Sequence, residues 1–173
     1  MTQPAHRPER QEFSIHAGAT EAPAVLTEWW GALDSDSEMR GLRFPGGDDV
    51  WLEDDELPGA LASAGCKVTE VISVDNYAGL SSPSLTVGQR VLLRPEPTNP
   101  YDHNAISVWL EDGSLQVGYL PRNVAAETNA EAQQRGTGFA AFVVKEVRDK
   151  NTEARQGLSI LLGPGAVWAS RAA

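Results

Sequence analysis

Three polar side chains in a proline-rich loop are the strongest candidates for ligand chemistry in this chain of 173 residues. Asn99, Tyr101 and Asp102 offer an amide, a phenol and a carboxylate close together in the sequence. Pro97 and Pro100 fix their own φ angles, and Pro100 also biases the residue before it toward an extended backbone. A stiff loop that presents these groups can bind a sugar hydroxyl and a base edge with little ordering cost.

Turn architecture is the alternative role for the same loop. Asn and Asp side chains hydrogen-bond to nearby backbone groups and so stabilise turns. Asp102 and Asn104 could therefore hold the loop in shape without touching a ligand. The residues alone leave both roles open.

The loop is part of a longer motif that resembles a known family. The residues from Arg94 to Ile106 read R-P-E-P-T-N-P-Y-D-H-N-A-I, and G-Y-L-P-R follows at 118–122. This resembles the signature of HIRAN domains, in which an E-P-x-N-P-Y-D-x-N-A-I loop precedes a strand and a V-G-Y/H-L arm precedes a helix. The resemblance extends with lower similarity over 67–162. It implies a mainly β fold with one or two helices, namely a small OB-like antiparallel β-barrel.

The resemblance implies that the chain binds DNA ends. HIRAN domains of eukaryotic fork-remodelling ATPases capture the 3′-hydroxyl end of single-stranded DNA. Carried over to this chain, Asp102 would accept a hydrogen bond from the terminal hydroxyl, Asn99 would contact the end nucleotide and Tyr77 would stack on a base. Arg122 would contact a phosphate, and Tyr119 would either stack on a base or lie half-buried in the sheet. The expected DNA-binding residues are Tyr77, Asn99, Tyr101, Asp102, Asn104, Tyr119 and Arg122.

Two positions depart from the family pattern. Asp75 and Asn76 stand where the DNA-binding eukaryotic members carry a basic and an aromatic residue. One phosphate contact and one stacking platform are therefore expected to be missing, which weakens binding to DNA.

Charge divides the chain into an acidic first third and a nearly neutral remainder. The net charge is -10, and residues 1–65 hold 4 Lys and Arg against 13 Asp and Glu, whereas residues 66–173 hold 10 against 11. Phosphate binding normally needs a basic surface, so the acidity counts against DNA binding mainly in the first third. Six carboxylates lie in the segment from Asp48 to Glu56. They form a solvated strip, bind a basic partner, or lie across the DNA-binding face as a mimic of DNA.

Three units are expected along the chain, as in a stand-alone, bacterial-type HIRAN protein with an acidic N-terminal extension. Residues 1–22 are polar and predict a mobile tail with a short extended piece at 13–15. Residues 23–65 form an acidic extension, whose Trp29, Trp30 and Trp51 either complete the core or bind a partner protein. Residues 66–168 form the HIRAN-like domain.

The last unit shows regular strand and turn patterns. An Asp-Gly pair at 112–113 predicts a β-hairpin. Pro121 opens a helix over 123–135, which Gly136 ends. Strands are predicted over 68–74, 87–93, 105–110, 116–120, 139–147 and 157–162.

Motifs for catalysis are not found in the sequence. No lysine follows a glycine as in a Walker A loop, no G-x-S-x-G elbow occurs, and the lone Cys66 with three scattered histidines suggests a buried thiol rather than a metal site. The carboxylates of the acidic segment are numerous enough to suggest the metal site of a nuclease, but their crowding in one short stretch favours a solvated strip. We therefore expect a protein that is not an enzyme and needs no cofactor.

The expected partners are single-stranded DNA ends and a separate helicase or nuclease subunit, in DNA repair, replication restart or defence. The alternative is a protein-protein interaction adaptor that uses the acidic, Trp-containing segment with the barrel as scaffold. No stretch approaches the roughly 20 apolar residues of a membrane helix, and the N-terminus has no apolar signal region. A cytoplasmic protein without membrane contact is expected.

Overall fold

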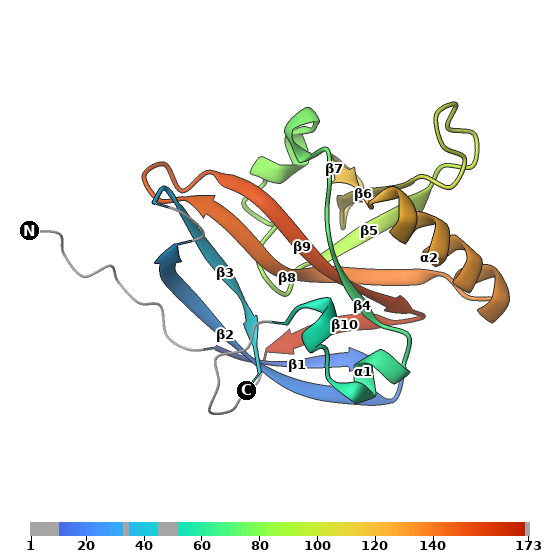
Figure 1. The fold of residues 1–173 in the computed structure, drawn as a ribbon, viewed down its shortest axis with the longest axis horizontal. Helices are drawn as coiled ribbons and strands as arrows, with labels where there is room; N and C mark the ends of the chain where they lie inside the picture. The colour runs from blue at the N-terminus through green and yellow to red at the C-terminus, as the bar shows by residue number, and fades with distance from the viewer. Residues whose placement is uncertain (1–10, 33–34, 45–51, 172–173) are drawn as a thin grey trace, which may run out of the picture.

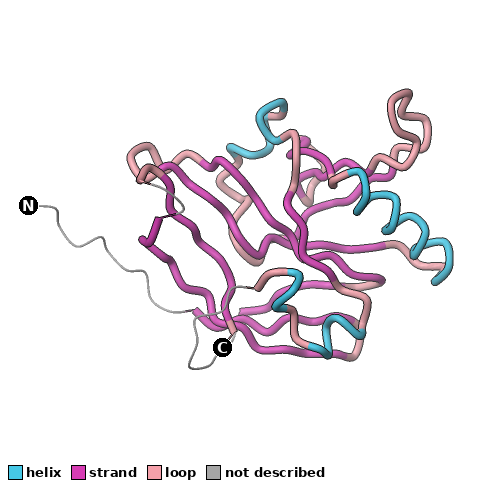
Figure 2. Tube along the Cα trace, in the orientation of Figure 1, coloured by secondary structure: helices cyan, strands magenta, loops and turns pink. Residues whose placement is uncertain are grey.

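The structure, a computed structural model, describes residues 11–32, 35–44 and 52–171. Antiparallel strands dominate it, and two α-helices lie beside them (Figures 1 and 2). The strands are β1 Gln11–Ala17, β2 Thr20–Ala32, β3 Ser37–Arg43, β4 Lys67–Glu70, β5 Arg90–Pro95, β6 Ile106–Leu110, β7 Gln116–Tyr119, β8 Phe139–Asp149, β9 Arg155–Pro164 and β10 Val167–Arg171. The helices are α1 Gly59–Ser63 and α2 Arg122–Arg135, with 3-10 turns η1 Asp54–Glu56, η2 Val74–Asn76 and η3 Ala78–Ser81.

Most elements predicted after Cys66 are confirmed, but the strand expected over 68–74 ends at Glu70, and β10 was not predicted. The predicted hairpin joins β6 to β7, and Asp112 Oδ1 accepts hydrogen bonds from the backbone N–H and the hydroxyl of Ser114 at 2.9 and 2.6 Å. Helix α2 follows Pro121 and ends at Gly136, which has a φ of 67° in the left-handed region that glycine tolerates. Local turn chemistry therefore sets most boundaries in this part of the chain.

The strand order is β10-β1-β2-β3-β8-β5-β6-β7, with β9 paired to both β8 and β4. A single bridge also joins Ile72, just after β4, to Tyr119 of β7. The structure thus shows a mainly antiparallel β fold with two helices, as expected, whereas a continuous closed barrel is not shown. Gly118 permits this bridge, because a Cβ at that position would lie 2.4 Å from the carbonyl oxygen of Ile72.

Strands β8 and β9 have buried side chains on both faces. Val143 and Ile160 pack into a core with β5 to β7 and α2. Their neighbours Phe142 and Leu161 point the other way, into a second core with β1, β3, β10 and α1. Because successive strand residues point to opposite faces, the apolar runs of β8 and β9 supply both cores.

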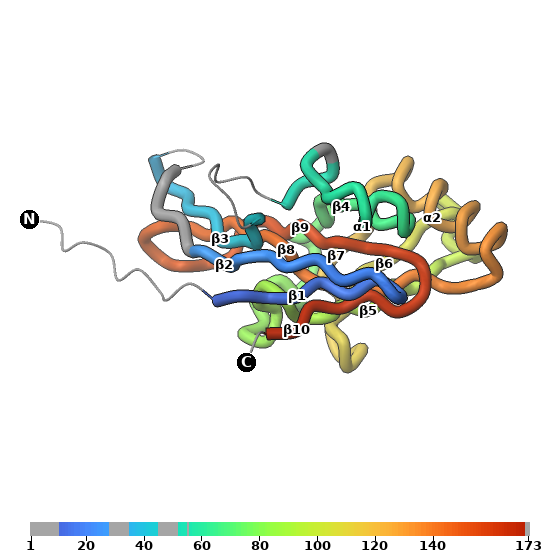
Figure 3. The backbone as a smooth tube through the Cα atoms, turned by 90° about the horizontal axis from the view of Figure 1, so that it is seen from below, coloured from blue at the N-terminus to red at the C-terminus, as the bar shows by residue number. Residues whose placement is uncertain are grey.

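The mobile tail predicted for 1–22 is wrong for its second half, while residues 1–10 lie outside the described part. Strand β1 pairs with both β2 and β10, and Figure 3 shows these N-terminal strands in the body of the molecule. Phe13 and Ile15 are buried and alternate with the more polar Ser14 and His16. The short extended piece predicted at 13–15 lies within β1, and this period of two is the strand signal that it reflects, although the strand is longer than predicted.

The N-terminal extension takes part in the second core. Leu42, Leu52 and Leu61 are almost completely buried there. The side chains of Trp29, Trp30 and Trp51 lie outside the described residues, so their predicted role stays a prediction. Apolar residues of 23–65 therefore complete a core, whichever role the tryptophans have.

A buried ion cluster connects the N-terminal strands to the rest of the sheet. Glu146 of β8 is 2% exposed and accepts hydrogen bonds from Arg148 at 2.7 Å and from Arg155 at 2.9 Å. Arg40 of β3 lies 3.9 Å from the same carboxylate. Losing one partner of such a buried cluster leaves an uncompensated charge, so the cluster favours the observed pairing of β3 with β8.

Candidate nucleic-acid interface

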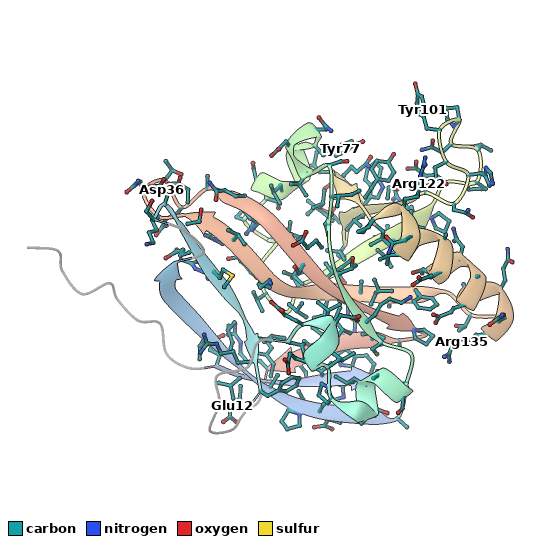
Figure 4. All side chains as sticks on the ribbon, in the orientation of Figure 1. Glu12, Asp36, Tyr77, Tyr101, Arg122 and Arg135 are labelled. Atoms are coloured by element: carbon teal, nitrogen blue, oxygen red, sulfur yellow. The ribbon has the colours of Figure 1, made fainter. Side chains whose placement is uncertain are left out.

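Six of the seven predicted site residues line one open groove of about 510 Å³. The groove lies where the motif loop, β7 and the segment after β4 meet, and Figure 4 labels Tyr77, Tyr101 and Arg122 on this side of the molecule. The residues that line it are Ile72, Ser73, Tyr77, Asn99, Pro100, Tyr101, Asp102, Ala105, Tyr119, Leu120 and Arg122.

Asn99 holds the motif loop together. Its Oδ1 accepts hydrogen bonds from the backbone N–H groups of Tyr101 at 2.9 Å and Asp102 at 3.2 Å. Its Nδ2 donates to Glu96 Oε1 at 3.0 Å. The turn role is therefore present, and the predicted contact of Asn99 with a nucleotide stays a prediction.

Asp102 joins the loop to the start of helix α2. Its Oδ1 accepts a hydrogen bond from the backbone N–H of Asn104 at 2.9 Å, and its Oδ2 lies 3.4 Å from Arg122 Nε. Arg122 also donates through Nη2 to the carbonyl of Tyr101 at 3.2 Å. The Arg122 side chain is 75% exposed, so most of its guanidinium remains open to solvent beside a carboxylate.

Glu96 is a centre of this site that the sequence analysis did not single out. Its Oε1 accepts hydrogen bonds from Asn99 Nδ2 and, at 2.9 Å, from the hydroxyl of Tyr119. Burial favours a raised pKa for Glu96, but hydrogen bonds from Asn99, Ser107 and Tyr119 outweigh it and leave the pKa below its usual value. Glu96 is thus an ionised acceptor that connects the loop to β7. Glu96 lies inside the motif from Arg94 to Ile106, and this position was the sequence signal that could have identified it.

The aromatic side chains differ in how they meet the groove. Tyr101 is 89% exposed, while Tyr77 and Tyr119 are half-buried and form an edge contact with ring centroids 6.0 Å apart. Burial raises the pKa of Tyr119 to about 12, and its hydrogen bond to Glu96 adds to the rise. The half-buried alternative for Tyr119 is therefore the one observed, and its ring still lines the groove.

Asn104 does not line the groove. Its backbone N–H binds Asp102, and its carbonyl accepts a hydrogen bond from Asn129 Nδ2 of α2 at 2.9 Å. The structure thus gives Asn104 a loop role, and direct contact with DNA stays a prediction. Asp75 and Asn76 are exposed in η2, close in sequence to Tyr77.

The described end of the acidic segment lies away from the groove. Glu53 pairs with Lys145 of β8 at 3.0 Å, and Asp54 Oδ1 accepts a hydrogen bond from the backbone N–H of Val68 in β4 at 3.0 Å. These contacts do not support a DNA mimic across the binding face, although residues 48–51 lie outside the described part. The acidic Glu12 and Asp36 also lie far from Tyr101 in Figure 4.

Metal clusters, membrane spans and reactive thiols are the other kinds of site that bear on function in the described part of the chain. No group of three or more potential ligands that could hold a metal ion occurs among those residues. None of the helices there has the length and apolar character needed to cross a membrane. Cys66 is buried, as predicted, and burial raises the pKa of its thiol.

Comparisons with known sequences point to one family. The HIRAN domain family matches residues 64–162, which is more than half of the chain. The helicase-like transcription factor of Oryctolagus cuniculus is 38% identical over 79 residues, which cover 46% of this chain and 7% of that protein. The chain therefore corresponds to a small part of that relative.

Two solved structures are also similar. The crystal structure of the HIRAN domain of human HLTF is 25% identical, covers 57% of this chain and 76% of that chain, and gives a TM-score of 0.43. A crystal structure of a protein from Lactobacillus plantarum is 26% identical, covers 58% of this chain and 91% of that chain, and gives a TM-score of 0.45. On the extent of the family match, this chain belongs to the HIRAN domain family.

Proposed function

We propose that the groove binds the free 3′-hydroxyl end of single-stranded DNA. The observation that carries this proposal is the meeting of Asp102, Arg122 and exposed Tyr101 at one open groove. These groups match the three parts of a strand end, which are a hydroxyl, a phosphate and a base. The family resemblance implies the same ligand.

The carboxylate of Asp102 supplies the selectivity. Its Oδ2 can accept a hydrogen bond from a hydroxyl, and a hydrogen bond to a charged acceptor contributes about 1.5–3 kcal/mol. A terminal phosphate would instead meet a like charge and be repelled. An end that carries a free hydroxyl is therefore preferred over a phosphorylated one.

Arg122 and the tyrosines supply affinity that does not depend on sequence. The exposed guanidinium of Arg122 can contact a phosphate while Nε stays near Asp102. Stacking of a base on an exposed aromatic ring contributes about 1–3 kcal/mol, and Tyr101 offers such a ring. Asp75, which is close in sequence to Tyr77, disfavours phosphate there, so few phosphates are neutralised at the groove and its own contribution to affinity is expected to fall only gently with salt.

Fluorescence anisotropy tests the proposal. A labelled single-stranded oligonucleotide with a free 3′-hydroxyl is compared with the same strand carrying a 3′-phosphate, at low and physiological salt. We expect the hydroxyl form to bind about tenfold tighter or more. Equal binding of the two forms, or no binding of either, contradicts end recognition.

Two variants of Asp102 separate recognition from loop shape. Asp102→Asn keeps an Oδ1 acceptor for the backbone of Asn104 but removes the charge, so the preference for hydroxyl over phosphate should shrink. Asp102→Ala should also lose binding to the hydroxyl form. Glu127→Gln, an equivalent change at a 63% exposed carboxylate on α2, is the matched control and should leave the preference unchanged.

The protein-interaction adaptor and a separate helicase or nuclease partner stay predictions. The adaptor depends on Trp29, Trp30 and Trp51, whose side chains lie outside the described residues. Leu52, which neighbours Trp51 in sequence, is buried in the second core rather than presented to a partner. The groove therefore offers the better-supported function.

A further inference from the structure

The outer face of strand β5 carries a row of exposed side chains beside the groove. Side chains alternate along a strand, and Arg90, Leu92 and Arg94 are exposed while Val91 is buried in the core. Leu92 is paired with Trp109 of the neighbouring strand β6, so the indole lies on the same outer face. An arginine therefore stands on each side of this leucine and tryptophan.

This face is continuous with the groove. Arg94 is paired with Ser107 of β6, and Ser107 is paired with Tyr119 of β7. Tyr119 lines the groove, and Trp109 Nε1 donates a hydrogen bond to Ser107 Oγ at 2.8 Å. Arg94 therefore lies on the same face of the sheet as Tyr119, two strands away, in the adjacent strands β5, β6 and β7 (Figure 1).

Both arginines lie against aromatic rings. The Arg94 guanidinium is 4.4 Å from the centroid of the Trp109 ring, and the Arg90 guanidinium is 5.6 Å from the centroid of the Trp168 ring in β10. His16 of β1 stacks on Trp168 with centroids 4.7 Å apart and planes 12° apart. We name this surface the arginine–aromatic strip, which consists of Arg94, Trp109, Leu92, Arg90, Trp168 and His16.

The strip contains two cations that form no salt bridge with the described residues. Among the described residues, neither Arg90 nor Arg94 forms a salt bridge, and each has its ring contact instead. Elsewhere in this acidic chain, Lys67 pairs with Glu127 and Glu131, and Lys145 pairs with Glu53. Two exposed arginines on one strand that lack a salt bridge within the described part of the chain are therefore unusual in a protein of net charge -10.

Two carboxylates border the strip at the β6–β7 turn. Glu111 Oε2 accepts a hydrogen bond from Gln89 Nε2 at 2.6 Å, and Asp112 Oδ1 is bound by Ser114. Hydrogen bonds from Ser114 lower the pKa of Asp112, so it is charged at neutral pH. Arg90 lines one hollow with both carboxylates, and Gly113 of the turn lies close to the Arg94 guanidinium, so the carboxylates weaken phosphate binding along β5.

We infer that the arginine–aromatic strip is a second contact for the same single strand, which binds the nucleotides upstream of the 3′ end held in the groove. Arginines with interleaved aromatic rings match the chemistry of single-strand binding, in which bases stack and cations follow the phosphates. Arg90 and Arg94 are four residues apart, about 13 Å along an extended strand, which allows two separate phosphate contacts. The inference rests on the proposed function, because the groove sets where the strand ends.

Oligonucleotide length separates the two contacts. Strands of about 4 and about 12 nucleotides, each with a free 3′-hydroxyl, are bound to the full chain in anisotropy titrations over a range of salt concentrations. The short strand reaches the groove alone, whereas the long one also covers the strip. The variant Arg90→Ala/Arg94→Ala is compared with Lys150→Ala, which removes an exposed cation in the β8–β9 turn.

The double variant should bind the long strand about tenfold more weakly or worse, with the short strand unchanged. Removal of two phosphate contacts should also reduce the slope of log affinity against log salt by about 1.4 for the long strand. Lys150→Ala should change neither the affinity for the long strand nor this slope. Glu111→Gln removes a nearby negative charge and should therefore make the long strand bind more tightly.

Each failure identifies which proposal is wrong. If the double variant binds the long strand as tightly as the unmodified chain, the strip is not a contact, and end recognition in the groove stands. If the long strand binds with the expected arginine dependence but equally well with a 3′-phosphate, end recognition fails and the strip stands. If the unmodified chain binds neither strand at low salt, both proposals are overturned.

Discussion

The two faces of the β8–β9 strand pair pack into two different hydrophobic cores. On one face, Val143 and Ile160 pack under the strands that carry the groove, within the part matched by the family. On the other face, Phe142 and Leu161 pack against β1, β3 and β10, none of which lies within 64–162. The comparison shows that the limits of the family match are not the limits of the hydrophobic core.

Two carboxylates of the molecule differ in how their charge is used. Glu146 is 2% exposed and binds Arg148 and Arg155, so its cluster stabilises the sheet. Glu96 is partly exposed and binds neutral donors from the loop and from β7, so it positions the groove. A carboxylate with several donors therefore has a structural or a positioning role according to its burial and its neighbours.

Deleting residues 1–58 should have the largest effect on this comparison. The deletion uncovers Phe142 and Leu161 and leaves β10 without β1, so we expect loss of cooperative folding and aggregation. Circular dichroism during a urea titration measures whether the fragment unfolds cooperatively. A soluble fragment with a cooperative transition would show that the N-terminal strands are dispensable, and tighter DNA binding by it would favour the DNA-mimic hypothesis.

Two single substitutions at adjacent positions of β9 should each have a smaller effect on stability, of similar size on the two faces. Ile160 and Leu161 are each fully buried but point into different cores. Ile160→Ala and Leu161→Ala should each lower the free energy of unfolding by about 2–5 kcal/mol, measured by urea denaturation. The exposed Glu70→Gln serves as control. A cost near zero for Leu161→Ala alone would mean that the N-terminal side is not a true core.

Tyr119 should give the smallest effect, confined to alkaline pH. Its pKa is raised from 10.0 to about 12 in the folded chain, so folding favours the protonated phenol. The stability that results is complete below a pH of about 10 and is lost as the pH rises toward about 12. Absorbance titration of tyrosinate should show one late step that Tyr119→Phe removes. If that step is unchanged in the variant, the late ionisation belongs to another tyrosine.

Local sequence signals predicted the elements after Cys66 well. The hairpin at Asp112-Gly113 and the helix between Pro121 and Gly136 depend on turn and cap geometry within a few residues. The motif likewise indicated which residues would meet, and six of the seven line one groove. The roles of these residues toward DNA stay predictions, since contact with a ligand is not a property of local geometry.

The N-terminal strands were harder to predict, because their stability comes from partners distant in the sequence. Strand β1 is paired with β10 at the opposite end of the chain, and the bridge between Ile72 and Tyr119 is likewise non-local. The continuous apolar run Phe139 to Val144 did contain a signal, since a strand buried on both faces loses the usual alternation. That signal says that a second layer exists but not which segment forms it.

By itself, the sequence determined the family, the local elements and the set of polar groups in the motif loop, because these follow from residue type and short spacing. Only the tertiary structure decided that Glu96 connects Asn99 to Tyr119, that Asn104 does not line the groove, and that the strip lies beside the groove. Such relations depend on strand register, and register is fixed by burial of side chains that lie far apart in the chain.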